Sequence, residues 1–459
     1  MALSANTVWE IRQDGDDDNG GGYKSDAGTT DYSQQAAAQL TVTDGATAGA
    51  TNTTLTSATG GFTSAMVGNV VHVWDAGGGS NITDGWYEIA AYTDTNTVTL
   101  DRAPDDGNGG VSGASVKVGG ALGTPGLAAS LMAEGHKAYV KYNATPYTLT
   151  TATPGAGGPV HFGTADKRAY MEGYETTRED GCPNGNRPEV KVPDSGVTFA
   201  ALTALFEGEG TANETQQFAN LKANGNSKSN TAGFVGDNDS NVHAVNCVAV
   251  DCDDDGFSTI KSERCLSQSN GSVGFDSCDA FFCRATGNAS AGIYNGTSSY
   301  SIADGNGGDG FIGYNTAFIN CVAYNNSGDG FGLLRNNICV NCISSSHGSG
   351  YEYDTADHSL LINCASYVGS SGRSDATPMA DLDAIPLSED PFVDPGNVDP
   401  ASCDFTLDPD GEDYDDLKAA GWGVVGQSSY ADVGAVQHED AGGGGGGVLR
   451  RLAKQYGIG

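Results

Sequence analysis

Two short sequence marks recur between Gly233 and Cys364, and their spacing limits what this chain can fold into. The first is glycine followed by an apolar or aromatic residue, with steps of 23, 18, 18, 18, 20 and 20 residues between the glycines. The second is cysteine, any residue, then alanine or serine, and it follows its glycine by 9 to 14 residues. The glycine marks begin at Gly233, Gly256, Gly274, Gly292, Gly310, Gly330 and Gly350.

A fixed period near 20 residues is typical of a solenoid, in which each unit buries its apolar face only by stacking on its neighbours. Leucine-rich repeats share this period, but leucine is nearly absent here and no helical pattern follows the marks. Each unit instead contains short runs of alternating apolar and polar residues, separated by turn-forming residues. We therefore predict a parallel β-helix whose coils repeat about every 4.8 Å.

Stacked coils place equivalent side chains above one another as ladders. The apolar ladder is predicted to contain Phe257, Phe275, Phe311 and Phe331. The cysteine ladder is predicted to contain Cys247, Cys265, Cys283, Cys321, Cys342 and Cys364, with a gap near Ser301. We expect these cysteines to be reduced and to serve as small apolar side chains.

The charge balance excludes some partners. The 459 residues include 22 basic and 58 acidic ones, which gives a net charge of −36. An acidic surface repels nucleic acids and anionic membranes, so we expect neither as a partner. The sequence begins without a basic and apolar leader, so we expect synthesis in the cytoplasm without a signal peptide.

We predict six segments in chain order. An N-terminal arm (1–38) leads into a small β module, a barrel or sandwich (39–119), in which short strands alternate with turns. A capping helix and irregular first coils (120–232) precede the regular β-helix (233–368) and closing coils (369–440). A six-glycine linker and a basic tail (441–459) end the chain. We expect the tail to dock on a partner or sister subunit through Leu449, Arg450, Arg451, Leu452 and Lys454. The alternative is a disordered terminus.

Three parts of the sequence resemble one family. The opening at Trp9-Glu10-Ile11-Arg12, the module with Phe62-Thr63-Ser64, and the close with Pro391-Phe392-Val393-Asp394 and Asp432-Val433-Gly434 are similar to pectate-lyase-like β-helix proteins of tailed-bacteriophage and prophage virions. The resemblance implies a right-handed all-β helix of about 18–23 residues per coil. It also implies a tail spike, fibre or head-decoration protein that contacts capsid or tail proteins, with a trimer favoured among homo-oligomers.

The same fold carries polysaccharide lyases and hydrolases, so we also searched for their chemistry. A lyase needs a cationic base, often with Ca²⁺ held by carboxylates, and a hydrolase needs two carboxylates. The candidate catalytic residues are Asp253, Asp255, Lys261, Arg264, Asp309 and Asp329. Asp255, Asp309 and Asp329 each precede a glycine, and we favour the interpretation that these three form ordinary turns.

Our leading hypothesis from sequence is a non-enzymatic structural protein on a virion surface, attached through its terminal segments and without a cofactor or metal. The first alternative is a polysaccharide-degrading spike, either a lyase or a glycoside hydrolase, with Ca²⁺ in the lyase case. The second alternative is a non-catalytic surface that binds host glycans through Tyr294, Tyr300, Tyr314 and Tyr324.

Overall fold

The computed structural model describes residues 3–49, 51–75, 82–104, 110–162, 168–194, 202–208, 215–228, 231–236, 241–348, 350–355, 359–367, 381–382, 385–388, 390, 392–394 and 404–407. These residues belong to two compact units. Unit 1 comprises residues 1–182, 186–199 and 206–221, and unit 2 comprises 183–185, 200–205 and 222–459. No helix in the described part of the chain is long and apolar enough to span a bilayer.

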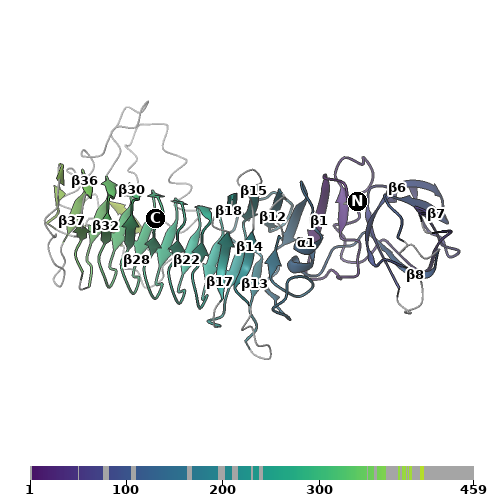
Figure 1. Cartoon of the computed structure of the whole chain (residues 1–459), viewed down its shortest axis with the longest axis horizontal. Helices are drawn as coiled ribbons and strands as arrows, with labels where there is room; N and C mark the ends of the chain where they lie inside the picture. Colours follow the sequence, from purple (N-terminus) through teal and green to yellow (C-terminus); the bar gives the residue numbers. More distant parts are fainter. Residues whose placement is uncertain are drawn as a thin grey trace. The chain divides into compact units, whose positions relative to one another are not determined.

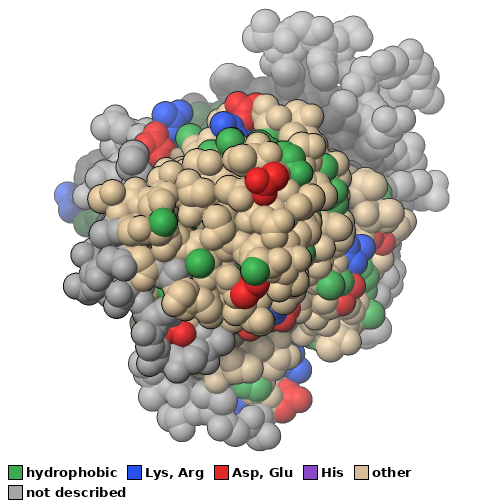
Figure 2. Space-filling model, turned by 90° about the vertical axis from the view of Figure 1, so that its right-hand side faces the viewer, with side chains coloured by type: hydrophobic (Ala, Val, Ile, Leu, Met, Phe, Trp, Pro, Cys, Tyr) green, Lys and Arg blue, Asp and Glu red, His purple; other side chains and the backbone are tan. Residues whose placement is uncertain are grey.

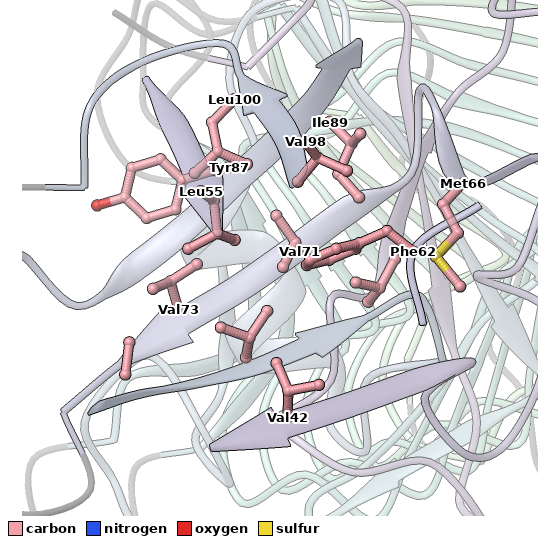
Figure 3. Packing of buried hydrophobic residues seen from close by; sticks show 13 residues of the cluster. Val42, Leu55, Phe62, Met66, Val71, Val73, Tyr87, Ile89, Val98 and Leu100 are labelled. Atoms are coloured by element: carbon pink, nitrogen blue, oxygen red, sulfur yellow. The ribbon is translucent and has the colours of Figure 1, made fainter. Parts of the chain in front are cut away.

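Unit 1 contains a closed six-stranded barrel, so the predicted small β module is a barrel rather than a sandwich. Its core includes Val71 and Val73 of β5, which strand alternation directs inward, together with Phe62 and Met66 from the segment before β5 (Figure 3). The barrel consists of β3 (Leu40–Thr47), β4 (Thr54–Thr56), β7 (Thr97–Leu100), β6 (Gly85–Asp94), β5 (Val70–Trp74) and β8 (Val111–Val118), with the 3₁₀ turn η1 (Ser64–Met66).

The rest of unit 1 forms the first coils. The helix α1 (Pro125–Leu131) is the predicted capping helix, with proline in its first turn. A mostly parallel sheet runs in the order β2 (Gly22–Lys24), β1 (Thr7–Ile11), β9 (Lys137–Lys141), β12 (Ala169–Tyr174) and β15 (Thr215–Ala219). Two further pairs are β10 (Tyr147–Thr148) with β13 (Glu189–Lys191) and β11 (Val160–His161) with β14 (Ala204–Gly208).

The N-terminal motif at Trp9 and Glu10 is a structural anchor. Trp9 is fully buried, and its indole N–H donates to His136 Nδ1 at 3.1 Å. The carboxylate of Glu10, also fully buried, accepts hydrogen bonds from Tyr174 and from Arg178, whose Nε lies 2.7 Å from Glu10 Oε2. The motif therefore fixes the N-terminal strand to coils far along the sequence.

Unit 2 is built from three parallel sheets, which confirms the predicted right-handed parallel β-helix (Figure 1). Each coil passes through the third sheet, then the first, then the second. The first sheet contains β18 (Asn241–Val245), β21 (Lys261–Glu263), β24 (Ala280–Phe281), β27 (Ser298–Ser299), β30 (Ala317–Ile319), β33 (Ile338–Val340), β36 (Leu360–Ile362) and β38 (Asp381–Leu382).

The other two sheets follow the same order. The second contains β16 (Lys222–Asn224), β19 (Val248–Val250), β22 (Leu266–Gln268), β25 (Arg284–Thr286), β28 (Ile302–Asp304), β31 (Val322–Tyr324), β34 (Ile343–Ser345), β37 (Ala365–Tyr367) and β39 (Ile385–Pro386). The third contains β17 (Ala232–Gly236), β20 (Phe257–Ser258), β23 (Phe275–Asp276), β26 (Ile293–Tyr294), β29 (Phe311–Tyr314), β32 (Phe331–Arg335) and β35 (Tyr353–Thr355). A terminal hairpin pairs β40 (Phe392–Asp394) with β41 (Asp404–Leu407).

The aromatic ladder lies on the third sheet. The rings of Phe257 and Phe275 stack with centroids 4.8 Å apart, and those of Phe311 and Phe331 with centroids 4.7 Å apart. Ile293 fills the rung between these two pairs. At the last rung the ring that stacks on Phe331 is Tyr353, at 5.1 Å. The ladder therefore continues through Glu352-Tyr353, and the Gly350-Tyr351 mark predicted from sequence is out of register by two residues.

The cysteine positions lie in consecutive turns between the first and second sheets, and all six ladder cysteines are buried. No disulfide joins the ten cysteines in the described part of the chain. Ser301 occupies the rung without a cysteine, where its hydroxyl accepts the backbone N–H of Cys283 at 3.2 Å. Burial raises the pKa of Cys265 and of Cys342 well above the ordinary thiol value.

An asparagine ladder inside the β-helix links successive coils. The side-chain amides of Asn270, Asn288 and Asn306 each donate to the side-chain oxygen of the next asparagine, ending at Asn326, at 2.9–3.0 Å. His347 takes the next place, and its Nδ1 accepts the backbone N–H of Asn326 at 3.2 Å. These bonds satisfy polar groups that burial would otherwise leave without partners.

Candidate functional site

The three candidate aspartates Asp255, Asp309 and Asp329 lie in the turns that enter the third sheet. Each carboxylate accepts a backbone N–H from the next coil: Val273 at 2.9 Å, Asp329 at 2.7 Å and Tyr351 at 2.6 Å, respectively. Burial raises the pKa of all three, that of Asp255 to about 6. Their contacts thus tie one coil to the next, which is a structural task.

The other candidates lie elsewhere on the coil. Lys261 is on the first sheet, where its Nζ lies 3.2 Å from Asn241 Oδ1, and Arg264 follows in the next turn, 2.5 Å from Glu263. Asp253 is exposed in the turn before the third sheet. The structure therefore does not bring the basic candidates together with Asp255. No group of three potential metal ligands occurs among the described residues.

The four tyrosines of the glycan-binding alternative are also dispersed. Tyr294 and Tyr314 lie on the third sheet and Tyr324 on the second, whereas Tyr300 occupies a turn. The Tyr324 ring contacts Phe392 of the terminal hairpin, with centroids 6.2 Å apart. The five proposed docking-tail residues, Leu449 to Lys454, lie outside the described part of the chain.

The barrel presents no concentrated patch on the face seen in Figure 2. Isolated acidic, basic and hydrophobic side chains are scattered there among uncharged polar groups and backbone.

A shallow pocket of about 140 Å³ lies next to α1, lined by Gln13, Thr124, Tyr147 and neighbouring residues. The Gln13 amide already donates to the carbonyls of Thr145 and Pro146, so this pocket offers little reactive chemistry.

A different cluster, missed by sequence reasoning, lies on the outward face of β9 and β12 in unit 1. Strand pairing places Lys137 beside Tyr170 and Tyr139 beside Glu172. Glu179 comes from the loop after β12, and the Tyr139 hydroxyl donates to its Oε1 at 2.5 Å. We call these five residues the Tyr–Glu face.

Glu172 is the recessed member of the Tyr–Glu face. It is only 7% exposed, and its carboxylate accepts hydrogen bonds from the Tyr170 hydroxyl at 2.7 Å and from the Asn220 amide at 3.1 Å. Burial raises the pKa of Glu172, and the nearby charge of Glu179 raises it further. A carboxyl in this setting holds its proton to higher pH than an exposed glutamate does.

The rim of the face is open to solvent. The side chain of Glu179 is 66% exposed and that of Lys137 is 51% exposed, with Nζ 4.0 Å from Glu179 Oε1. The Lys137 ammonium also lies 5.7 Å from the centre of the half-buried Tyr170 ring. The arrangement combines a recessed carboxyl, an amine and an aromatic ring on two paired strands with a second carboxylate from the following loop.

The raised pKa of Asp255 makes stability depend on pH. Between its ordinary value of 3.8 and about 6, the folded chain binds more protons at this site than the unfolded chain does. Stability is therefore lost as pH rises through this window, and the loss persists at pH 7. We expect Asp255→Asn to stabilise the protein by about 1 kcal/mol at pH 7, after allowance for solvent screening, and by nothing near pH 3.5. Chemical denaturation at both pH values measures this.

The control for that change is Asp253→Asn, on the same turn but exposed, which should change stability at pH 7 by less than Asp255→Asn does. Asparagine keeps an oxygen that can accept the Val273 N–H, so the substitution isolates the charge. Equal stabilisation at pH 3.5 and pH 7 would show that ionisation of Asp255 is not the cause.

No family model matches this sequence, and no curated protein does. Among solved structures, the chain is similar to pectate lyase Pel9A (18% identity, 68% of this chain and 90% of that one, TM-score 0.47). It is also similar to the A-module of mannuronan C-5 epimerase AlgE4 from Azotobacter vinelandii (12%, 56% and 89%, TM-score 0.34). A third is the catalytic unit of a GH87 α-1,3-glucanase from Streptomyces thermodiastaticus (10%, 74% and 87%, TM-score 0.28).

Proposed function

We propose that this chain is a carbohydrate-active β-helix protein, a glycoside hydrolase whose site is the Tyr–Glu face. The observation that carries the proposal is the recessed carboxyl of Glu172 in the same cluster as the exposed carboxylate of Glu179. Cleavage of a glycosidic bond requires two carboxyl groups with different tasks, one protonated and one ionised. The two glutamates differ in this respect, because Glu172 is buried with a raised pKa and the side chain of Glu179 is exposed.

In this scheme Glu172 acts as the general acid. Its raised pKa favours retention of a proton that it can donate to the leaving oxygen, while the exposed carboxyl group of Glu179 is placed to assist water or to stabilise positive charge at the sugar. The Tyr170 ring offers an apolar surface for a sugar face, and the Lys137 ammonium can donate hydrogen bonds to hydroxyl groups. The substrate class follows from charge, because the exposed carboxylate of Glu179 on a chain of net charge −36 disfavours polyuronates and favours neutral glycans.

The test is incubation of the purified protein with a panel of neutral and acidic polysaccharides. We expect new reducing ends from a neutral glycan and no unsaturated products. Unsaturated products from a polyuronate would contradict hydrolysis and favour a lyase. Absence of both turnover and binding across the panel would count against any carbohydrate role.

We further propose a setting for this activity, which is the surface of a phage virion, with other virion proteins and copies of the same chain as partners. The support is the sequence resemblance at the Trp9 motif, in the barrel segment and in the closing segment. Immunogold labelling of purified particles tests it. Labelled particle surfaces are expected, and particles free of this protein by both labelling and mass spectrometry would exclude the setting.

A further inference from the structure

The outward side of the first sheet becomes wholly apolar in three consecutive coils. On β30, β33 and β36 the inward residues are Phe318, Cys339 and Leu361, which are buried. The outward positions flanking them form what we call the apolar face: Ala317, Ile319, Ile338, Val340, Leu360 and Ile362. Ile319 is 37% exposed and Ile338 is 43% exposed.

The same sheet is charged in earlier coils. On β21 the outward positions are Lys261 and Glu263, and Glu263 pairs directly with exposed Phe281 of β24. The change from charged to apolar is therefore local. Strands that are apolar on both sides are typical of sheets covered on both faces, and a contiguous exposed apolar patch usually marks a binding surface.

The C-terminal tail at 448–456 has the complementary sequence pattern. As a helix, it would align Val448, Leu449, Leu452 and Tyr456 along one stripe, because they follow the spacing i, i+3 or i+4, and i+7 or i+8. Arg450, Arg451 and Lys454 would lie off this stripe. Their positive charge is opposite to that of the strongly acidic remainder of the chain, so attraction favours contact with the body. A short amphipathic helix is marginal alone and is stabilised by packing on an apolar surface.

The chain is long enough for this contact. Forty residues separate Leu407, the last described residue, from Val448, and six of them are consecutive glycines. A chain of 40 residues reaches at most about 140 Å when fully extended, so its length does not prevent this contact. The three strands of the apolar face are only about 10 Å across, at about 4.8 Å per coil.

We propose that the C-terminal tail, residues 448–456, docks on the apolar face of β30, β33 and β36 of the same chain. The proposal concerns an intramolecular contact and does not depend on the proposed hydrolase activity. It assigns a single occupant to the apolar face, namely a tail whose charge and residue spacing suit that surface.

The test uses the full-length protein and the rate of trypsin cleavage at Arg450, Arg451 and Lys454. Docking should protect these bonds. We expect the double variant Ile319→Ser/Ile338→Ser to be cleaved in the tail at least about tenfold faster than the parent chain. The control Leu334→Ser, a 46%-exposed leucine on the third sheet, should be cleaved at the parental rate. Thermal melting checks that both variants remain folded.

A second variant changes the tail instead of the apolar face. Leu449→Ser/Leu452→Ser leaves the β-helix untouched and should accelerate cleavage to a similar degree. Equal rates in the parent chain and both double variants would overturn the proposal. Loss of protection on dilution of the parent protein would also overturn it, in favour of docking between two copies.

Discussion

Replacing Arg178 with alanine should destabilise unit 1 by about 3–5 kcal/mol, because it leaves a fully buried carboxylate without its cation. The Arg178 guanidinium lies 2.7 Å from Glu10 Oε2 and 2.9 Å from Asp31 Oδ2, and it donates to the Ser33 hydroxyl at 3.0 Å. Burial already raises the pKa of Glu10, and Arg178 opposes that rise. Urea denaturation followed by tryptophan fluorescence measures the loss, since Trp9, Trp74 and Trp86 all lie in unit 1.

The matched control is Arg168→Ala. This arginine also pairs with a glutamate, Glu134 at 3.6 Å, but its side chain is 65% exposed. Exposed pairs contribute about 0–1 kcal/mol, so the control should shift the midpoint little. Adding Glu10→Gln to Arg178→Ala should recover part of the loss, because it removes the uncompensated charge. Equal destabilisation by the two arginine changes would contradict the role assigned to the Glu10–Arg178 pair.

Replacing Glu172 with glutamine should lower kcat by about 10²–10⁴-fold, the range expected for loss of a general acid. Glutamine is nearly isosteric and can still accept the Asn220 hydrogen bond, so KM should change much less. In the proposed mechanism the protonated form of Glu172 is the active one, so activity should fall as pH rises through its raised pKa. Initial rates on the glycan identified by the polysaccharide panel measure both effects.

Asp309→Asn is the control for this change. Asp309 is likewise a carboxylate whose pKa is raised by burial, but it ties two coils together outside the Tyr–Glu face. Its replacement should leave kcat within about twofold of the parent value. Comparable losses in the two variants would mean that the Glu172 effect arises from general disturbance of the fold rather than from proton transfer.

The regular coils could be predicted from sequence because the same residue types recur at the same positions. Glycine is needed before the aromatic rung: a Cβ on Gly256 would lie 2.3 Å from Ser267 Oγ. Because of this requirement, the Gly–Phe mark recurs in the sequence up to Phe331. The mark is absent in the last coil, where Glu352 occupies the glycine position and its carboxylate accepts a hydrogen bond from the Ser344 hydroxyl at 2.8 Å. Gly350-Tyr351 imitates the mark two residues too early.

The candidate site could not be predicted in the same way. The coils containing β9 and β12 lack a repeating mark, so nothing in the sequence pairs Tyr139 with Glu172, 33 residues later. Glu179 reaches the cluster from a loop. One signal was present, since alternation in β9 and β12 leaves charged and tyrosine side chains on the same outward side. The aspartates of the repeating turns were instead the candidate catalytic residues, but those aspartates repeat because the coils stack.

Hydrogen exchange of the full-length protein, with and without the neutral glycan that it cleaves or binds, tests the central claim most directly. Glycan bound at the Tyr–Glu face should slow amide exchange in β9, in β12 and in the adjoining loop through Glu179. Slowed exchange confined to residues 251–264, or no change in unit 1 at saturating glycan, would contradict the assignment of the site.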